Sequence, residues 1–334
     1  MIAKRFKHIP LSILDLAPIK EGSTARDALL ETVDLAQHAD KWGFKRYWLA
    51  EHHNMPGIAS SATSVLIAHV AEKTKHLRVG AGGIMLPNHA ALVIAEQFGT
   101  LESLFPGRID LGLGRAPGTD QMTAYALRRD LKQRVEEFPD QVEELEAYFT
   151  GTGIVRAFPG EGLDIPIWLL GSSGFSARLA AEKGLPFSFA SHFSPNNTIP
   201  ALNIYRDLFK PSEQLAKPYA MLGINVIAAD SDEEAQFLAT SSEQQFLSLR
   251  RGRPTTLKPP VSNLEEMCTP SEWIAVKNSL TSGSTIVGSP ETVKRGLENF
   301  IEKTNADELI IHTQIFDHKA RLRSYEIIAE FMEA

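Results

Sequence analysis

Cysteine is almost absent from this sequence, since Cys268 is the only one among 334 residues. A single cysteine excludes an intrachain disulfide and a zinc site built on a cysteine cluster. A block of basic residues is also missing, and with a net charge of −7 we expect no nucleic-acid partner. No apolar run is long enough to cross a membrane, and none follows the charged first residues as in a signal peptide. We therefore expect a cytoplasmic protein without membrane contact.

What recurs along the chain is a short apolar run followed by a longer segment with helical periodicity. The runs are nearly continuous in hydrophobic character, as expected for strands buried on both faces. They predict eight strands, at Pro10–Leu16, Arg46–Ala50, Leu77–Leu86, Arg108–Gly114, Pro166–Leu170, Pro186–Ala190, Tyr219–Ala228 and Glu308–Thr313. This alternation is typical of an α/β fold, the (β/α)8 TIM barrel, here as one domain over 1–334. A doubly wound open sheet is the alternative, but no G-x-G-x-x-G follows the first strand.

Several helix boundaries carry recognisable end signals. Thr24 with Asp27, and Ser231 with Glu234, have the spacing of a capping box. Gly184 has the position of a residue that ends a helix in the left-handed conformation.

The segment Arg250–Gly283 interrupts the alternation. It holds four prolines and begins with basic residues. We interpret it as an insertion between strands seven and eight. It either lies on the surface or forms a lid over the mouth of the barrel.

Functional residues of a barrel follow the carboxyl ends of its strands. After the fifth strand, the segment Gly171–Ser176 opens a helix whose free N–H groups and hydroxyls suit a phosphate. The alternative is that these serines only cap the helix. Arg115 ends the fourth strand and favours the phosphate, because a guanidinium matches phosphate geometry. Its own alternative is a salt bridge on the rim.

The second strand ends in Glu51, His52 and His53. Successive residues of a strand point to opposite faces, so the paired histidines cannot easily bind one metal ion, and we expect no metal. A histidine at the mouth can act as a general acid or base near neutral pH. It can equally be a hydrogen-bonded residue of the rim, and Glu51 could orient it.

Gly82 and Gly83 lie inside a predicted buried strand, where glycine is costly unless the backbone approaches something closely. A flat ligand against the strand would explain them, as would a bulge or an unusual peptide geometry.

Together these segments resemble the bacterial luciferase-like family of flavin-dependent monooxygenases, especially an uncharacterised branch found in enterobacteria. The resemblance runs from the first strand to the last helix. Its motifs are Trp48-Leu49-Ala50-Glu51-His52-His53, Val79-Gly80-Ala81-Gly82-Gly83-Ile84-Met85-Leu86-Pro87, Pro106-Gly107-Arg108-Ile109-Asp110-Leu111-Gly112-Leu113-Gly114-Arg115 and Pro166-Ile167-Trp168-Leu169-Leu170-Gly171-Ser172-Ser173.

The resemblance implies a catalytic role for His52, which would support formation and decay of a flavin hydroperoxide. It also implies a non-proline cis peptide bond between Gly82 and Gly83, beside the flavin ring. Residues that would bind the cofactor phosphate are Arg115, Gly171, Ser172, Ser173 and Ser176. Residues expected on the substrate side are Glu51, His53 and His192. Luciferase itself has a reactive cysteine where this chain has Gly114, so light emission is not implied.

The activity implied by the resemblance is oxygenation of a small organic substrate with O2 and reduced FMN, supplied by a separate NAD(P)H:flavin reductase. Family resemblance also implies a homodimer packed through the second and third helices. Three alternatives stay open at this point. They are an F420-dependent oxidoreductase on the same fold, a non-catalytic FMN-binding flavoprotein, and a metal-dependent hydrolase that uses the paired histidines.

Overall fold

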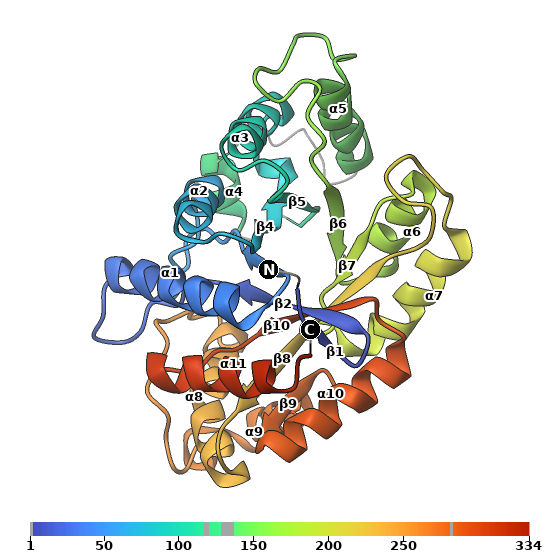
Figure 1. Ribbon diagram of the computed structural model, residues 1–334. Helices are drawn as coiled ribbons and strands as arrows, with labels where there is room; N and C mark the ends of the chain where they lie inside the picture. Colours follow the sequence, from blue (N-terminus) through green and yellow to red (C-terminus); the bar gives the residue numbers. More distant parts are fainter. Residues whose placement is uncertain (1–2, 117–119, 128–136, 281–282, 334) are drawn as a thin grey trace.

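The computed structural model describes residues 3–116, 120–127, 137–280 and 283–333, and its centre is a closed barrel of parallel strands (Figure 1). The barrel closes because the first of these strands pairs with both the second and the last. Its strands are β2 Ile9–Asp15, β3 Arg46–Leu49, β4 Arg78–Met85, β5 Ile109–Gly114, β6 Ile167–Gly171, β7 Phe187–Phe189, β8 Ala220–Ala228 and β10 Glu308–His312. The predicted (β/α)8 barrel and all eight predicted strands are confirmed.

Helices surround the barrel (Figure 1). They are α1 Ala25–Trp42, α2 Thr63–Lys73, α3 Ala91–Leu104, α4 Gln121–Leu127, α5 Phe138–Thr150, α6 Gly174–Lys183, α7 Thr198–Leu208, α8 Asp232–Arg250, α9 Pro270–Leu280, α10 Pro290–Thr304 and α11 His318–Glu330. The capping box of Thr24 and Asp27 is formed, and Gly184 ends α6 with a φ of 66°. Ser231 accepts a hydrogen bond from the backbone N–H of Glu234, which is one of the two bonds of the second predicted box. Among the described helices, none is both long and apolar enough to span a membrane.

Two short strands were missed by the sequence prediction. The strand β1, Arg5–Phe6, pairs antiparallel with β2. The strand β9, Thr285–Gly288, pairs with the upper half of β8, from Asn225 to Ala228. The first has two residues, too few for a periodic pattern. The second has four residues, as many as β3, but it directly follows the segment that was interpreted as an insertion.

The middle of the barrel is filled by two tryptophans that meet edge to face. The ring centroids of Trp48 and Trp168 are 5.2 Å apart. Glycines stand on the neighbouring strand β4 at positions where no side chain would fit. A Cβ on Gly80 would lie 2.9 Å from the indole nitrogen of Trp48, and one on Gly82 would lie 2.8 Å from the side chain of Leu14. Trp48, Leu14 and Asp110 therefore leave no room for a side chain at these two positions of β4.

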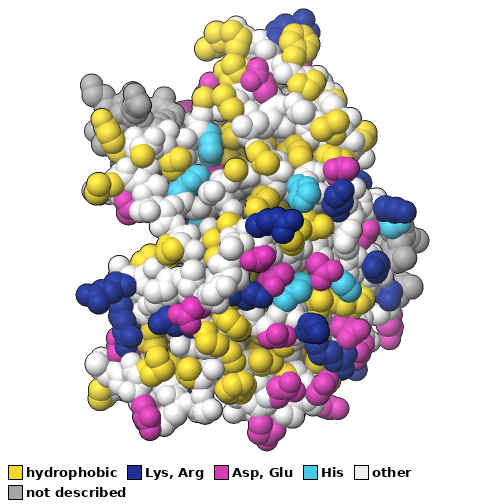
Figure 2. Space-filling view, turned by 90° about the vertical axis from the view of Figure 1, so that its left-hand side faces the viewer, with side chains coloured by type: hydrophobic (Ala, Val, Ile, Leu, Met, Phe, Trp, Pro, Cys, Tyr) yellow, Lys and Arg dark blue, Asp and Glu magenta, His cyan; other side chains and the backbone are white. Residues whose placement is uncertain are grey.

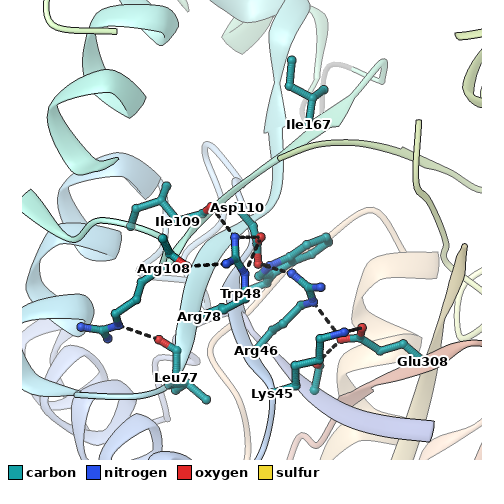
Figure 3. A network of polar contacts seen from close by, with 12 residues as sticks. Lys45, Arg46, Trp48, Leu77, Arg78, Arg108, Ile109, Asp110, Ile167 and Glu308 are labelled. Carbon is teal, nitrogen blue, oxygen red and sulfur yellow. Dashed lines mark hydrogen bonds and ion pairs between the residues drawn. The ribbon is translucent and has the colours of Figure 1, made fainter. Parts of the chain in front are cut away.

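A buried ionic network forms the floor of the barrel, at the amino-terminal ends of the strands (Figure 3). Arg46 donates to Glu308 at 3.0 Å and to Asp110 at 2.6 Å, and Arg78 also pairs with Asp110 at 2.7 Å. Burial alone would raise the pKa of both carboxyls. The Arg46 guanidinium, together with Arg78 at Asp110 and with Lys45 at Glu308, lowers the pKa of each overall. This network closes the end of the barrel that lies opposite the predicted site.

The predicted insertion lies between β8 and β10, and its central loop reaches the other side of the mouth. The N–H of Leu257 donates to the carbonyl of Ile19 at 2.9 Å, and the N–H of Glu21 donates back to Leu257 at 2.7 Å. Gln245 on α8 holds the carbonyl of Thr255 at 3.2 Å. The loop is thus fastened at both of its sides.

One face of the molecule, on the side of α1, carries charges of both signs among hydrophobic side chains (Figure 2). The basic side chains seen there do not merge into a continuous patch (Figure 2).

Candidate functional site

Three histidines meet at the mouth of the barrel. His52 follows β3, His192 follows β7, and His312 ends β10. Around the barrel, β2 separates β10 from β3 and β8 separates β10 from β7, so His312 lies between the two predicted histidines. The rings of His192 and His312 are 6.2 Å apart, and Nδ1 of His312 is 3.1 Å from Oδ1 of Asn225. The sequence analysis identified His52 and His192 but missed His312 and Asn225.

Burial keeps these histidines neutral at neutral pH. It lowers the pKa of His52, although the nearby Glu51 carboxylate acts in the opposite direction. It lowers the pKa of His192 to about 4. Burial, reinforced by His192, lowers the pKa of His312 to about 3. Each ring therefore keeps one nitrogen lone pair and one N–H, and can both accept and donate a hydrogen bond.

Two ring nitrogens of the mouth have no protein partner. Nδ1 of His52 and Nδ1 of His192 are buried, and no described residue forms a hydrogen bond with either. A buried polar atom left unpaired is costly, so such atoms indicate where a ligand or solvent completes the site.

Glu51 supports the site from behind. Its side chain is 1% exposed and accepts hydrogen bonds from Nε2 of His53 and of His89, each at 2.9 Å, and from the N–H of Met85 at 3.1 Å. Burial would raise the pKa of this carboxyl, but the hydrogen bond with His89 helps to lower it overall. Glu51 and His53, the two sequence neighbours of His52, are thus joined to the end of β4 and to the loop that follows it. Through these bonds Glu51 orients His53 and His89.

The peptide bond between Gly82 and Gly83 is cis, as the family resemblance implies. The register between β4 and β5 shifts at this point, between Ala81 and Ile84. A Cβ on Gly83 would lie 2.7 Å from the carbonyl oxygen of Gly112. The wall here consists of bare backbone, against which a flat ring system can lie.

A candidate anion cradle lies where α6 begins, next to Gly171. Ser173 is the N-cap residue, is exposed and makes no side-chain capping bond. Ser176, in the first turn, is 3% exposed. The guanidinium of Arg115 lies 4.0 Å from the ring centroid of Phe175, which brings a positive charge to this helix end. Helix N–H groups, the hydroxyls of Ser172, Ser173 and Ser176, and a guanidinium together suit a phosphate.

The sequence left two alternatives open, namely that the serines only cap α6 and that Arg115 forms a salt bridge on the rim. Ser173 makes no side-chain capping bond, and within the described residues no ion pair joins Arg115 to a carboxylate. Across the described part of the chain, no group of three or more His, Cys, Asp and Glu side chains is arranged to hold a metal ion.

A cavity of about 1070 Å³ lies among α7, α8, α9 and α10, next to β9. It contains none of the predicted site residues. We locate the site at the strand ends instead, because the unpaired ring nitrogens, the bare backbone and the anion cradle converge there.

A family model described as luciferase-like monooxygenase matches residues 9–308. The chain belongs to the luciferase-like monooxygenase family. A luciferase-like monooxygenase of Escherichia coli (strain K12) is 54% identical over 330 residues, which cover 98% of each chain. An N-acetyl-S-alkylcysteine monooxygenase of Bacillus subtilis (strain 168) is 34% identical and covers 96% of this chain and 98% of its own.

Among solved structures, apo-MsnO8 is similar with a TM-score of 0.91 and 35% identity, over 97% of this chain and 98% of that one. These likenesses confirm the predicted family. The protein is therefore an oxidoreductase that incorporates oxygen, a flavin-dependent monooxygenase of the luciferase-like family.

Proposed function

We propose that this luciferase-like monooxygenase uses reduced FMN and O2 to transfer one oxygen atom to a small organic substrate. A separate NAD(P)H:flavin reductase supplies the reduced flavin. The observation that carries the proposal is the convergence of an anion cradle, a bare backbone wall and neutral histidines on one mouth.

The residues present fit FMN. Arg115, the N–H groups at the start of α6 and the hydroxyls of Ser172, Ser173 and Ser176 would hold the phosphate, next to Gly171. The backbone of Gly82 and Gly83 would support the ring. When bound, reduced FMN would supply the two electrons that activate O2.

His52 is proposed to move a proton at the reacting centre. Burial lowers the pKa of His52, so its neutral ring can accept or donate a proton at the operating pH. Glu51 fixes the loop from which His52 projects, through its bonds to His53 and to Met85. The closed ionic floor keeps water from entering through the opposite end of the barrel.

Thioethers are the substrate class that we propose to test first. The support is the Bacillus subtilis relative, which is named for N-acetyl-S-alkylcysteines and aligns over nearly the whole chain. Oxygen transfer to sulfur would give a sulfoxide, and the second oxygen atom of O2 would leave as water.

The segment 250–283 is proposed to belong to the same domain as the barrel and to form one wall of the mouth. The backbone bonds of Leu257 to Ile19 and Glu21 support a fixed wall rather than a swinging lid. For the homodimer, exposed hydrophobic side chains on the second and third helices support packing through them, with Val65 67% and Leu104 62% exposed.

Anaerobic titration of the purified protein with reduced FMN, oxidised FMN and reduced F420 tests the cofactor. We expect reduced FMN to bind most tightly. After admission of O2 and N-acetyl-S-methylcysteine, mass spectrometry should detect the sulfoxide. Tighter binding of F420 would favour the F420-dependent alternative. Binding of FMN without oxygen consumption would favour the non-catalytic flavoprotein.

A further inference from the structure

Two hydrogen bonds connect a side chain of strand β9 to a histidine at the mouth of the barrel. Nδ2 of Asn225 donates to Oγ1 of Thr285 at 3.3 Å, and Oδ1 of Asn225 lies 3.1 Å from Nδ1 of His312. The three residues are neighbours because of the strand register. Asn225 on β8 lies opposite His312 on β10 and opposite Thr285 on β9. Strand pairing therefore places the Asn225 side chain between Thr285 and His312, and the hydrogen bonds turn its oxygen toward the histidine.

The orientation of the Asn225 amide decides where His312 carries its proton. Because the amide nitrogen faces Thr285, the amide oxygen faces His312, and a carbonyl oxygen only accepts hydrogen bonds. Nδ1 of His312 must then hold the proton and donate it. The lone pair is left on Nε2, and no described residue pairs with that atom.

We propose that Asn225 positions His312 so that Nε2 accepts a hydrogen bond from an N–H or O–H group of the substrate. The site thereby selects substrates that carry such a donor near the oxidised atom. The proposal rests on the proposed function, and it makes His312 a substrate-binding residue and Asn225 a positioning residue.

The surroundings of His312 suit this role. Burial, with His192 6.2 Å away, lowers the pKa of His312 to about 3, so the lone pair is retained at neutral pH. A site built to pair with a donor rejects an analogue that lacks it, because the buried acceptor is then left unsatisfied. An N-acetylated thioether carries an amide N–H of this kind, whereas a dialkyl sulfide does not.

The first test is independent of turnover. In the full-length protein labelled with ¹⁵N-histidine, the ring-nitrogen shifts of His312 report its tautomer. We expect the Nδ1–H form in the natural sequence and in Asn225→Asp, which keeps an acceptor at this position. Asn225→Leu removes the acceptor and should give a mixture of tautomers. His76→Gln, an exposed histidine at the other end of the barrel, serves as control. A His312 ring that carries its proton mainly on Nε2 overturns the proposal.

The second test compares two probes, N-acetyl-S-methylcysteine and methyl propyl sulfide. His312→Phe keeps a ring but removes both nitrogens. We expect its kcat/KM to fall at least 10-fold for the acetylated probe and less than 3-fold for the sulfide, mostly through KM. An equal loss for both probes overturns the proposal. If neither probe is oxygenated by the unmodified protein, the proposed substrate class fails, and the tautomer alone decides the role of Asn225 and His312.

Discussion

His192 lies directly against Gly223: a Cβ added to Gly223 would be 2.3 Å from Nδ1 of the histidine. The glycine thus gives the His192 ring its place beside His312. We predict that Gly223→Ala displaces this ring and destabilises the protein by about 1–3 kcal/mol, the usual range for overpacking. Urea unfolding measures the effect.

A double-mutant cycle identifies the origin of that loss. If the clash is with His192, the variant Gly223→Ala/His192→Ala should be more stable than the sum of the two single effects requires. Strict additivity would place the clash elsewhere.

Removal of the Arg115 guanidinium should weaken FMN binding. We expect Arg115→Ala to raise the Kd for reduced FMN by about 10–100-fold, because a charge-assisted contact of roughly 1.5–3 kcal/mol is lost. Anaerobic titration measures it. Arg156→Ala is a matched control. The guanidinium of Arg156 also lies over a phenylalanine ring, 4.6 Å from the ring centroid of Phe158, but it is outside the site. Equal affinity of the Arg115 variant and the control would remove Arg115 from the phosphate site.

His52→Ala should lower kcat by a factor of about 100 or more, as is typical for loss of a general acid or base. Steady-state oxygenation with a saturating supply of reduced FMN measures it, and His76→Ala should retain full activity. Unchanged turnover of the His52 variant would exclude the histidine from the mechanism.

The neutral histidines predict a loss of stability in mild acid. The pKa of His192 is about 4 and that of His312 about 3 in the folded protein, against 6.5 normally. Between about pH 6.5 and 4 the unfolded chain binds protons that the folded chain does not. The free energy of unfolding therefore falls as pH falls through this window and is constant above it.

Thermal unfolding between pH 7.5 and 4.5 checks this sign. The fall in Tm should be shallower for His192→Gln/His312→Phe than for the unmodified protein, and unchanged for His76→Gln. The carboxyl of Asp15, with a pKa near 2 instead of 3.8, adds its own loss only at lower pH. Parallel Tm profiles for all three proteins would contradict the assignment.

The floor of the barrel should tolerate little change. Arg46→Met leaves the buried carboxylates of Asp110 and Glu308 without their shared partner, which typically costs about 3–5 kcal/mol. Urea unfolding again gives the free energy. Arg323→Met, which removes a half-exposed set of ion pairs on α11, should cost no more than about 1 kcal/mol.

The sequence could predict what depends on local pattern. Apolar runs located every barrel strand, and the strand-end rule led to His52, Arg115 and Ser176. Asn225 escaped because it lies inside a run that is otherwise apolar, and its inward direction follows only from the strand register. His312 was within reach of the same rule, since it stands at the end of the last predicted strand. Its bond to Asn225 depends on pairing between strands distant in sequence, which no local pattern contains.

The ionic floor has a kinetic consequence. With Arg46, Asp110 and Glu308 closing one end of the barrel, everything that reacts must pass through the same opening. Cofactor, O2 and substrate then enter through the same mouth. The one that binds deepest has to bind first and be released last. A barrel that is open at only one end favours a compulsory order of binding and release over a random one.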